Sequence, residues 1–185
     1  MANEKNNFWT EQAVNPKRKY RFKVEFTGIA PTEAGLGLAW YAKTCDKPEI
    51  TVKTGEVNYM AHKFYYPGTV EWNEINLVLV DPAGDMDVAV ATSWLMERMG
   101  YVGPQDASNN PILPTKSQAF ELIITQIDAV GKPIEIWTLK NAICTKLGFG
   151  QLDYSSEDLS EINMSFRYDW AEITDSAGFR AFDGS

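Results

Sequence analysis

The chain has 185 residues, enough for a single domain that buries its own core without disulfide bonds or metals. Its 25 acidic and 17 basic residues give a net charge of -8. This balance argues against a protein whose purpose is to hold nucleic acid, because such affinity comes mainly from Lys and Arg neutralising phosphates. The start lacks the pattern of an export signal, and no stretch approaches the roughly 20 apolar residues of a membrane span, so we expect a soluble, unexported chain with no membrane partner. The two cysteines, Cys45 and Cys144, predict buried free thiols in a reducing compartment.

Residues 1–16 form a polar N-terminal segment whose large apolar side chains are Phe8 and Trp9. The segment predicts an extended arm, and its two aromatics dock either on their own domain or on a neighbour. Alternating apolar and charged residues then predict a half-buried strand over residues 20–26, with a mostly basic outer face. A shorter strand is expected over residues 38–44.

Residues 47–68 predict a projecting hairpin. Two β-prone runs, residues 49–53 and 57–66, lie on either side of Thr54-Gly55, where we place the turn, and Pro67-Gly68 closes the segment. The hairpin has too much aromatic surface for an unattended loop, so it either folds back onto the core or packs on a partner, and we favour the partner. The residues concerned are Tyr59, Met60, Phe64, Tyr65 and Tyr66.

Residues 69–80 predict one long strand with a β-bulge near Asn73, because the alternation of apolar residues shifts there. Asp85 then stands where a helix N-cap belongs, and one flanking α-helix is predicted over about residues 85–99. The long polar segment 101–116 predicts a mobile or functional loop. The apolar stripe of the helix comprises Val88, Ala91, Leu95 and Met99, widened by Val90 and Trp94.

The second half of the chain is again typical of strands. Residues 119–129 have apolar residues on both faces and predict a central strand, which a turn joins to a strand over residues 134–139. Residues 142–147 predict a further short strand. After the final strand, residues 171–185 predict a C-terminal arm, polar apart from Ile173, Phe179 and Phe182.

The clearest strand covers residues 160–170, where apolar and polar side chains alternate. Its even face predicts a contribution to the core, because burying five large apolar side chains is worth roughly 10 kcal/mol in sum. These side chains are Ile162, Met164, Phe166, Tyr168 and Trp170. The odd face is polar, as in an antiparallel sheet with one face in water, and comprises Glu161, Asn163, Ser165, Arg167 and Asp169.

The residues that catalysis or metal binding usually needs are scarce. The one histidine, His62, has no acidic residue within four positions, so a packing role is the more common one. Asp81, Asp85 and Asp87 are the nearest approach to a metal site, and strand termination and helix capping explain them better. We therefore expect no cofactor, no bound metal and no enzymatic activity.

Several groups of aromatic and turn residues follow one another in a particular order along the chain. They are Asn15-Pro16 ahead of Tyr20-Arg21-Phe22, residues 64–68, residues 72–79 leading into the helix, residues 137–139, residues 152–155 and Tyr168-Asp169. In this order the groups resemble the tail tube proteins of T-even-type contractile-tailed bacteriophages, over about residues 15–170. The tube proteins of type VI secretion systems and of extracellular contractile injection systems are similar in fold.

The resemblance implies one mainly β tail-tube domain over residues 1–185, an antiparallel β-sandwich or barrel-like fold with one flanking helix. It implies hexameric rings that stack into a hollow tube inside a contractile sheath, through which the phage genome is ejected. The expected partners are further copies of the chain, the tail sheath, the baseplate and tail-terminator proteins, and double-stranded DNA that passes without sequence-specific binding. The expected location is the virion tail, assembled in the host cytoplasm.

On this interpretation, the odd face of residues 160–170 contributes to a channel wall of neutral to negative potential, along which DNA slides. The lumen-facing candidates are Glu161, Asn163, Ser165, Arg167 and Asp169. The candidates for ring stacking and subunit contacts are Phe8, Trp9, Tyr59, Met60, Phe64, Tyr65, Tyr66, Phe179 and Phe182. Two alternatives stay open: the tube protein of a type VI or extracellular contractile injection system, and a monomeric β-rich binding protein or enzyme.

Overall fold

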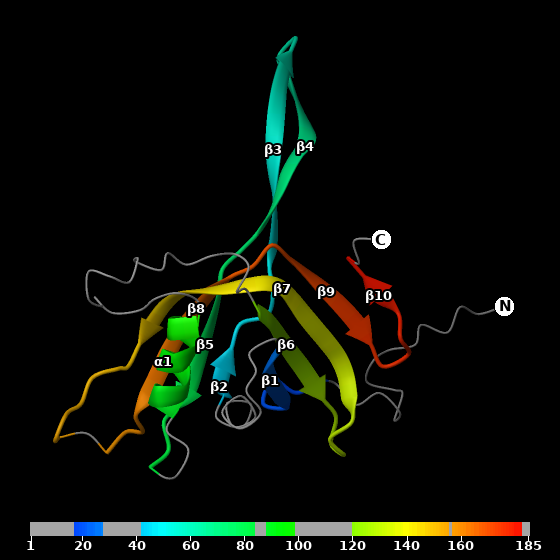
Figure 1. Cartoon of the computed structure of the whole chain (residues 1–185). Helices are drawn as coiled ribbons and strands as arrows, with labels where there is room; N and C mark the ends of the chain where they lie inside the picture. Colours follow the sequence, from blue (N-terminus) through cyan, green and yellow to red (C-terminus); the bar gives the residue numbers. More distant parts are fainter. Residues whose placement is uncertain (1–16, 28–41, 84–87, 99–119, 156, 183–185) are drawn as a thin grey trace, which may run out of the picture.

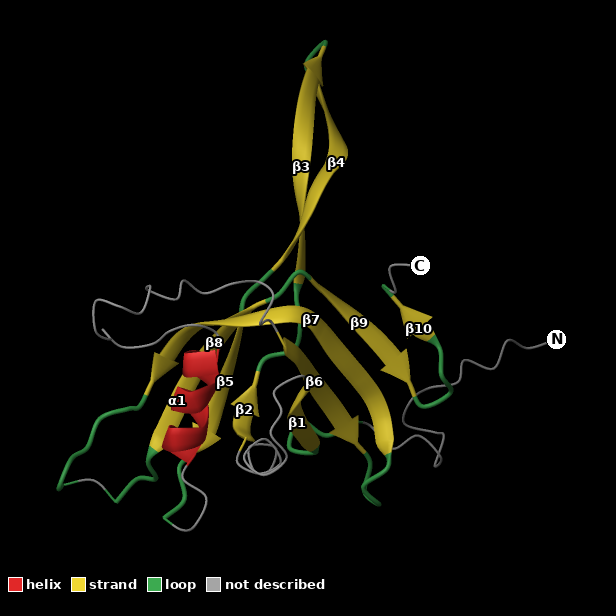
Figure 2. Ribbon diagram, viewed as in Figure 1, coloured by secondary structure: helices red, strands yellow, loops and turns green. Residues whose placement is uncertain are grey.

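Ten β-strands and one α-helix make up the part of the chain that the computed structural model describes (Figures 1 and 2). This part comprises residues 17–27, 42–83, 88–98, 120–155 and 157–182. All the strand pairs in it are antiparallel, which confirms the mainly β fold with one helix. The elements are β1 (Phe22–Thr27), β2 (Ala42–Cys45), β3 (Ile50–Tyr59), β4 (His62–Trp72), β5 (Ile75–Val80), α1 (Val88–Arg98), β6 (Phe120–Ile127), β7 (Pro133–Gly148), β8 (Glu161–Arg167), β9 (Trp170–Asp175) and β10 (Arg180–Ala181).

Eight of the described strands belong to one sheet, and β3 and β4 form a separate two-stranded hairpin. The order in the sheet is β1-β6-β7-β8-β5-β2, with β9 paired to β7 and β10 paired to β9. β6 therefore lies between β1 and β7, which confirms the central position predicted for residues 119–129. The predicted N-terminal arm over residues 1–16 and the loop over residues 101–116 lie outside the described residues.

β7 is one long strand that bends at Asn141 and connects two parts of the sheet. Its first half pairs with β9 and its second half pairs with β8. Asn141 has a φ of 55°, in the left-handed region that Asn adopts more readily than most residues. Its Nδ2 donates a hydrogen bond of 2.8 Å to Oδ2 of Asp169, where β8 gives way to β9. The prediction of two separate strands over residues 134–139 and 142–147 was wrong, because the irregular residue turns one strand without ending it.

The core lies inside the curved sheet, where side chains from strands that are not neighbours meet, and α1 adds Val88 and Leu95 to it. β8 contributes Ile162, Met164 and Phe166, each at most 1% exposed, which confirms the buried even face predicted for residues 160–170 at these positions. The prediction was wrong for Trp170, which is 37% exposed because it begins β9 beyond the bend. The Phe166 ring packs against Phe26 of β1 and Phe120 of β6, with centroid distances of 5.9 and 5.7 Å. Strands from both ends of the sheet therefore share one core.

The predicted final strand divides at residues 168–169, and Trp170 begins β9. The prediction of a C-terminal arm was wrong as far as residue 181, because β9 pairs with β7 and β10 pairs with β9. Ala171 in β9 is fully buried. β8 pairs only with the second half of β7, so the backbone N–H and C=O groups along the same edge of the first half need other hydrogen-bond partners. β9 supplies these partners.

α1 packs its apolar side against the core. Val88 and Leu95 are buried, which confirms the predicted stripe at these two positions. Val90 is 63% exposed and does not widen the stripe, because two residues along a helix correspond to roughly 200° of rotation. The predicted N-cap over residues 85–87 and Met99 lie outside the described residues.

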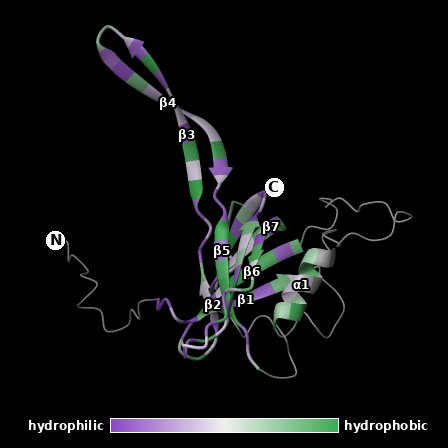
Figure 3. Ribbon diagram, turned by 90° about the vertical axis from the view of Figure 1, so that its left-hand side faces the viewer, coloured by the Kyte–Doolittle hydropathy of each residue, from purple (hydrophilic) through white to green (hydrophobic). Residues whose placement is uncertain are grey.

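The hairpin projects from the body as predicted, but its turn lies elsewhere. Both views show β3 and β4 standing away from the sheet (Figures 1 and 3). Met60 and Ala61 form the turn, with φ values of 46° and 65°, so the prediction of a turn at Thr54-Gly55 was wrong. Gly55 is paired with Tyr66, and a Cβ at position 55 would lie 2.2 Å from Cζ of that ring. The glycine therefore makes room for an aromatic ring across the hairpin.

The prediction of one bulged strand over residues 69–80 was also wrong, because β4 ends at Trp72 and β5 begins at Ile75. Asn73 lies in the gap and closes the base of the hairpin. Its backbone N–H donates to the Glu49 carbonyl at 2.9 Å, and its Nδ2 donates to Oε2 of Glu49 at 3.0 Å. The alternation of apolar residues shifts between Trp72 and Ile75 because the chain leaves the hairpin there and enters the main sheet.

Candidate assembly surfaces

The outer half of the β3–β4 hairpin has one apolar and one polar face. Residues directly opposite each other on paired strands point to the same face, and successive pairs alternate. The polar face includes Lys63, whose Nζ lies 3.2 Å from Oε2 of Glu56. The pairs on the apolar face are Gly55 with Tyr66, Val57 with Phe64, and Tyr59 with His62. The pairs on the polar face are Glu56 with Tyr65, and Asn58 with Lys63.

The predicted contact residues of the hairpin are all exposed in the described structure. Met60, at the turn, has 78% of its surface exposed, and the other four predicted residues are more than half exposed. Such a surface of large apolar side chains marks an interaction site in a soluble protein. Whether a second subunit covers it stays a prediction, as it does for Phe179, which is also exposed, and for Phe8 and Trp9, which lie outside the described residues.

Phe182 is 54% exposed, as the hairpin aromatics are, but its ring also packs within the chain. It meets the Trp72 ring edge-on at a centroid distance of 5.7 Å. Trp72 in turn lies 6.0 Å from the ring of Tyr168. We call Trp72, Tyr168 and Phe182 the base cluster, because Trp72 is the last residue of β4. The cluster connects the hairpin to the C-terminal segment.

The odd face of β8, predicted to line a channel, is only partly exposed. Glu161 is half-buried, and Asn163 and Arg167 are exposed. Ser165 is 7% exposed and donates from its hydroxyl to Oδ1 of Asn76 at 2.9 Å. Asp169 lies beyond the strand, at the bend. The structure therefore brings Glu161, Asn163 and Arg167 together on one surface.

Opposite charges neutralise much of this surface. Lys43 on β2, which is separated from β8 by β5, forms an ion pair with Glu161. Arg167 lies 3.5 Å from a carboxylate oxygen of Glu74 and 3.8 Å from one of Glu71. These exposed pairs contribute little to stability, but they leave the outer face of β8 close to neutral.

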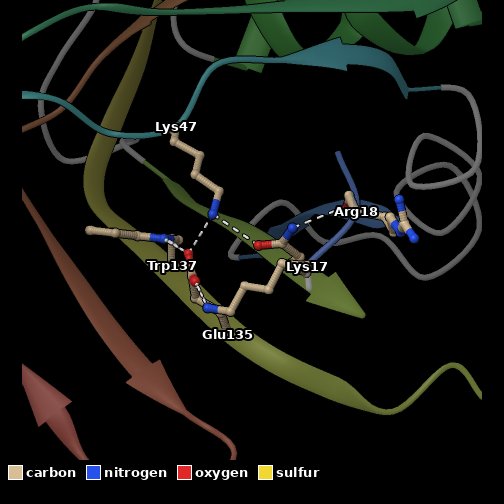
Figure 4. Close-up of polar contacts among 6 residues, drawn as sticks. Lys17, Arg18, Lys47, Glu135 and Trp137 are labelled. Atoms are coloured by element: carbon tan, nitrogen blue, oxygen red, sulfur yellow. Dashed lines mark hydrogen bonds and ion pairs between the residues drawn. The ribbon is translucent and has the colours of Figure 1, made fainter. Parts of the chain in front are cut away.

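A buried carboxylate that sequence patterns did not single out connects three distant segments (Figure 4). Glu135 on β7 is 7% exposed and accepts hydrogen bonds from Lys17, from Lys47 at 2.6 Å and from the Trp137 indole at 2.5 Å. Lys47 also donates to Oε1 of Gln126 at 2.9 Å. Burial alone would raise the pKa of Glu135, but the three hydrogen bonds outweigh it and lower this pKa to about 2.

The Glu135 cluster joins the end of β6, the start of β7 and the start of the described chain. Gln126 extends it by donating to the carbonyl of Arg18 at 3.2 Å, which holds the start of the described chain against β6. The one sequence feature that could have pointed to this cluster was the run of basic residues near the N-terminus. Lys17 of that run pairs with Glu135, which lies 118 residues further along the chain, so no local pattern could reveal the partner.

No group of three His, Cys, Asp or Glu side chains suited to a metal ion occurs among the described residues. His62 begins β4, next to the hairpin turn, and is exposed. Cys45 and Cys144 are free thiols, and burial raises their pKa values to about 12 and about 11. Within the described segments, no helix combines the length and the apolar character needed to cross a bilayer.

The fold is shared with proteins of contractile injection systems. A chain of the anti-feeding prophage cap, which terminates the tube, matches with a TM-score of 0.62 and 17% identity, covering 91% of this chain and 98% of that one. A chain of the sheath–tube complex of the extracellular contractile injection system PVC, in the extended state, matches at 0.61 and 16% identity, covering 88% and 94%. A chain of the anti-feeding prophage baseplate matches at 0.60 and 12% identity, covering 88% and 97%. No family model and no curated protein sequence matches the chain.

Proposed function

We propose that the chain is a structural subunit of the inner tube of a contractile bacteriophage tail. Six copies form a ring, and rings stack into a hollow conduit for the genome. The observation that carries this proposal is the match to contractile injection system proteins over nearly the whole length of both chains. The projecting hairpin supports it, because its large apolar surface needs a partner. The role is structural rather than enzymatic.

The same comparisons suggest the partners. The matched chains come from a sheath–tube complex, a tube-terminating cap and a baseplate. By analogy, the tube of this protein contacts a tail sheath, a baseplate and a tail-terminator protein. The protein is then assembled in the host cytoplasm and resides in the tail of the virion.

The neutralised outer face of β8 supports a conduit for DNA. Duplex DNA carries one charge per roughly 1.7 Å of its axis, so a basic wall would hold it through counterion release. Glu161 and Arg167 are both paired with opposite charges, and Asn163 is uncharged. A wall of this kind lets DNA slide. On this proposal the other two lumen candidates do not face the conduit directly. Ser165 lies beneath the wall surface, and Asp169 lies at the bend after β8.

A second candidate function is the tube of an extracellular contractile injection system or a type VI secretion system. The specific observation in its favour is that the matched structures reported above come from contractile injection systems. The subunit would assemble in the same way and carry a different cargo. Neighbouring genes separate the two candidates, because a capsid and a terminase accompany a phage tail and an injection ATPase accompanies the other system.

Negative-stain electron microscopy and size-exclusion chromatography of the purified chain test the assembly. We expect rings or tubes from the unmodified protein. Phe64→Asp should abolish them, because it places a charge on the apolar face of the hairpin. Val130→Asp is the matched control, since Val130 is 89% exposed and lies on the turn between β6 and β7. A monodisperse monomer at all concentrations would favour a β-rich binding protein or enzyme and contradict the proposal.

A further inference from the structure

Residues 17–20, which precede Arg21 and β1, form an exposed segment on the surface of the body. None of the four side chains is buried, and Tyr20 is 72% exposed. Pairing with β6 begins only beyond the segment, where the Ile127 N–H donates to the Arg21 carbonyl at 3.1 Å. The segment is therefore held to the body by polar side-chain contacts and not by sheet pairing.

Within the part of the chain that the structure describes, two hydrogen-bonded contacts tie residues 17–20 to the body. The Lys17 ammonium group pairs with Oε2 of Glu135, and Nε2 of Gln126 donates to the Arg18 carbonyl at 3.2 Å. We call residues 17–20 the strap, because these contacts hold it against the end of β6 and the start of β7 (Figure 4). The strap leaves the body when these two contacts break.

The second carboxylate oxygen of Glu135 has partners of its own. Oε1 accepts hydrogen bonds from Lys47 at 2.6 Å and from the Trp137 indole at 2.5 Å. Lys47 lies in the connection between β2 and β3, a different part of the chain from the strap. A buried charge that loses its only ionic partner strongly destabilises a protein. When Lys17 leaves, however, Glu135 keeps one ion pair and one neutral hydrogen bond.

Lys47 is also more firmly anchored than Lys17. Its ammonium group donates to Oε1 of Gln126 at 2.9 Å as well as to Glu135, so it bonds one acceptor on β6 and one on β7. Among the described residues, the Lys17 side chain bonds Glu135 alone. One broken contact therefore frees Lys17, whereas Lys47 is freed only when two contacts break.

We propose that the strap is releasable: residues 17–20 detach from the body while Lys47 keeps Glu135 paired. Lys17 is the contact that opens, and Lys47 preserves the charge balance in both states. β1 stays paired with β6, so a partner can take up the segment without disturbing the sheet. Four extended residues span up to roughly 14 Å, which is the reach of the opened strap. This movement takes place within one subunit and goes beyond the proposed tube function.

Limited proteolysis with trypsin measures strap opening, because the enzyme cleaves after Arg18 and Lys19 only when the segment leaves the body. The cleavage rate then follows the population of the open state. Lys17→Met should raise this rate several-fold, as measured by mass spectrometry of the fragments. Lys23→Met is the matched control and should leave the rate unchanged. Lys23 is also about half exposed and pairs with a single carboxylate, that of Glu25, at 2.9 Å.

Urea unfolding tests the role of Lys47. Lys47→Met should lower the midpoint more than Lys17→Met does, because it removes two contacts. The double variant should lose more than the sum of the two single changes, since the buried carboxylate is then left with the indole alone. Adding Glu135→Gln should raise the midpoint of that double variant, because the uncompensated charge is gone. Every protein in both experiments also carries Phe64→Asp, so that tube formation does not cover the strap.

Each outcome decides a separate part of the proposal. Faster cleavage in Lys17→Met than in Lys23→Met, together with a more than additive loss in the double variant, supports the releasable strap. Equal cleavage in Lys17→Met and Lys23→Met shows that Glu135 does not hold the strap and overturns the proposal. Equal midpoints for Lys17→Met and Lys47→Met, or an additive double variant, overturn the role of Lys47. None of these results bears on the tube function, which electron microscopy of the unmodified protein tests.

Discussion

At the scale of single residues, Gly150 shows how a backbone position can exclude every side chain. It has a φ of 74°, in the left-handed region, and a Cβ there would lie 2.8 Å from the Glu161 carbonyl oxygen. Gly131 has a similar φ of 84°, but a Cβ there would meet nothing within 4 Å. The two glycines therefore differ in steric surroundings and not in backbone conformation.

Gly150→Ala should destabilise the protein more than Gly131→Ala. The left-handed backbone costs an L-residue about 1–2 kcal/mol, and we expect Gly131→Ala to show that cost alone. Gly150→Ala should lower the free energy of unfolding by about 1 kcal/mol more than Gly131→Ala does, since the Glu161 carbonyl must move to make room for the new Cβ. Urea unfolding followed by circular dichroism measures both. Equal midpoints for the two variants would show that the Glu161 carbonyl does not matter.

Glu135 is the residue whose ionisation contributes most clearly to the fold. Its pKa falls from an ordinary value of 4.5 to about 2, so its stabilising effect is fully present above about pH 4.5 and is lost as the pH falls toward 2. Glu135→Gln should lower stability at pH 6 and flatten the decline between pH 4.5 and pH 2.

Urea midpoints measured at pH 6 and pH 3 test this prediction. Glu25→Gln is the matched control, because Glu25 pairs with Lys23 at 2.9 Å while both side chains remain about 40% exposed. An exposed pair of this kind contributes little. If the two variants show the same pH dependence as the unmodified protein, the hydrogen bonds to Glu135 do not stabilise the fold.

At the scale of elements, the hairpin depends on its attachment to the body. A two-stranded ribbon is only marginally stable in water without further packing. The base cluster of Trp72, Tyr168 and Phe182 supplies such packing where β4 meets the sheet. Asn73 adds hydrogen bonds to Glu49 at the same place. The orientation of the hairpin is therefore determined at its base.

Phe182→Ala should loosen the hairpin base without unfolding the body. We expect hydrogen exchange of the backbone amides at the base of β3 and β4 to become several-fold faster, because an aromatic contact worth about 0.5–1.5 kcal/mol is lost. Amides of β6 and β8 should be unaffected. Phe179→Ala, three residues away at a 70% exposed position, is the control. Identical exchange in the two variants would remove Phe182 from the base cluster.

At the scale of the whole molecule, the proposed tube function makes the charge on the outer face of β8 testable. Glu161→Lys adds two positive charges and Asn163→Lys adds one. A variant with both substitutions therefore carries three more positive charges per subunit. If this face lines the conduit, assembled tubes should then retain duplex DNA at 50 mM salt and release most of it at 200 mM, because counterion release drives the binding.

Co-sedimentation of duplex DNA with tubes of each variant provides the measurement. Glu25→Lys with Val130→Lys adds the same three charges away from the β8 face, and its tubes should retain less DNA. Equal retention by the two double variants would place the β8 face outside the conduit. Tubes of the unmodified protein should retain little DNA under either condition.

Local sequence patterns were sufficient for features that depend on one buried face. The alternation around Ile162, Met164 and Phe166 predicted β8, because a strand with one dry side must place apolar residues at every second position. The helical spacing of Val88 and Leu95 predicted α1 for the same reason. The exposed aromatics of the hairpin and the mainly β fold class were predicted as well.

Only the tertiary structure decided the features that depend on distant partners. The hairpin turn lies at Met60-Ala61 because Tyr66 packs across Gly55, so the glycine that indicated a turn has another role. The predicted C-terminal arm is mostly a strand because β7 had an unpaired edge. Glu135 meets Lys17 across 118 residues. Local patterns record which face of a segment is buried, whereas strand pairing and ion pairs depend on which segments meet in the folded chain.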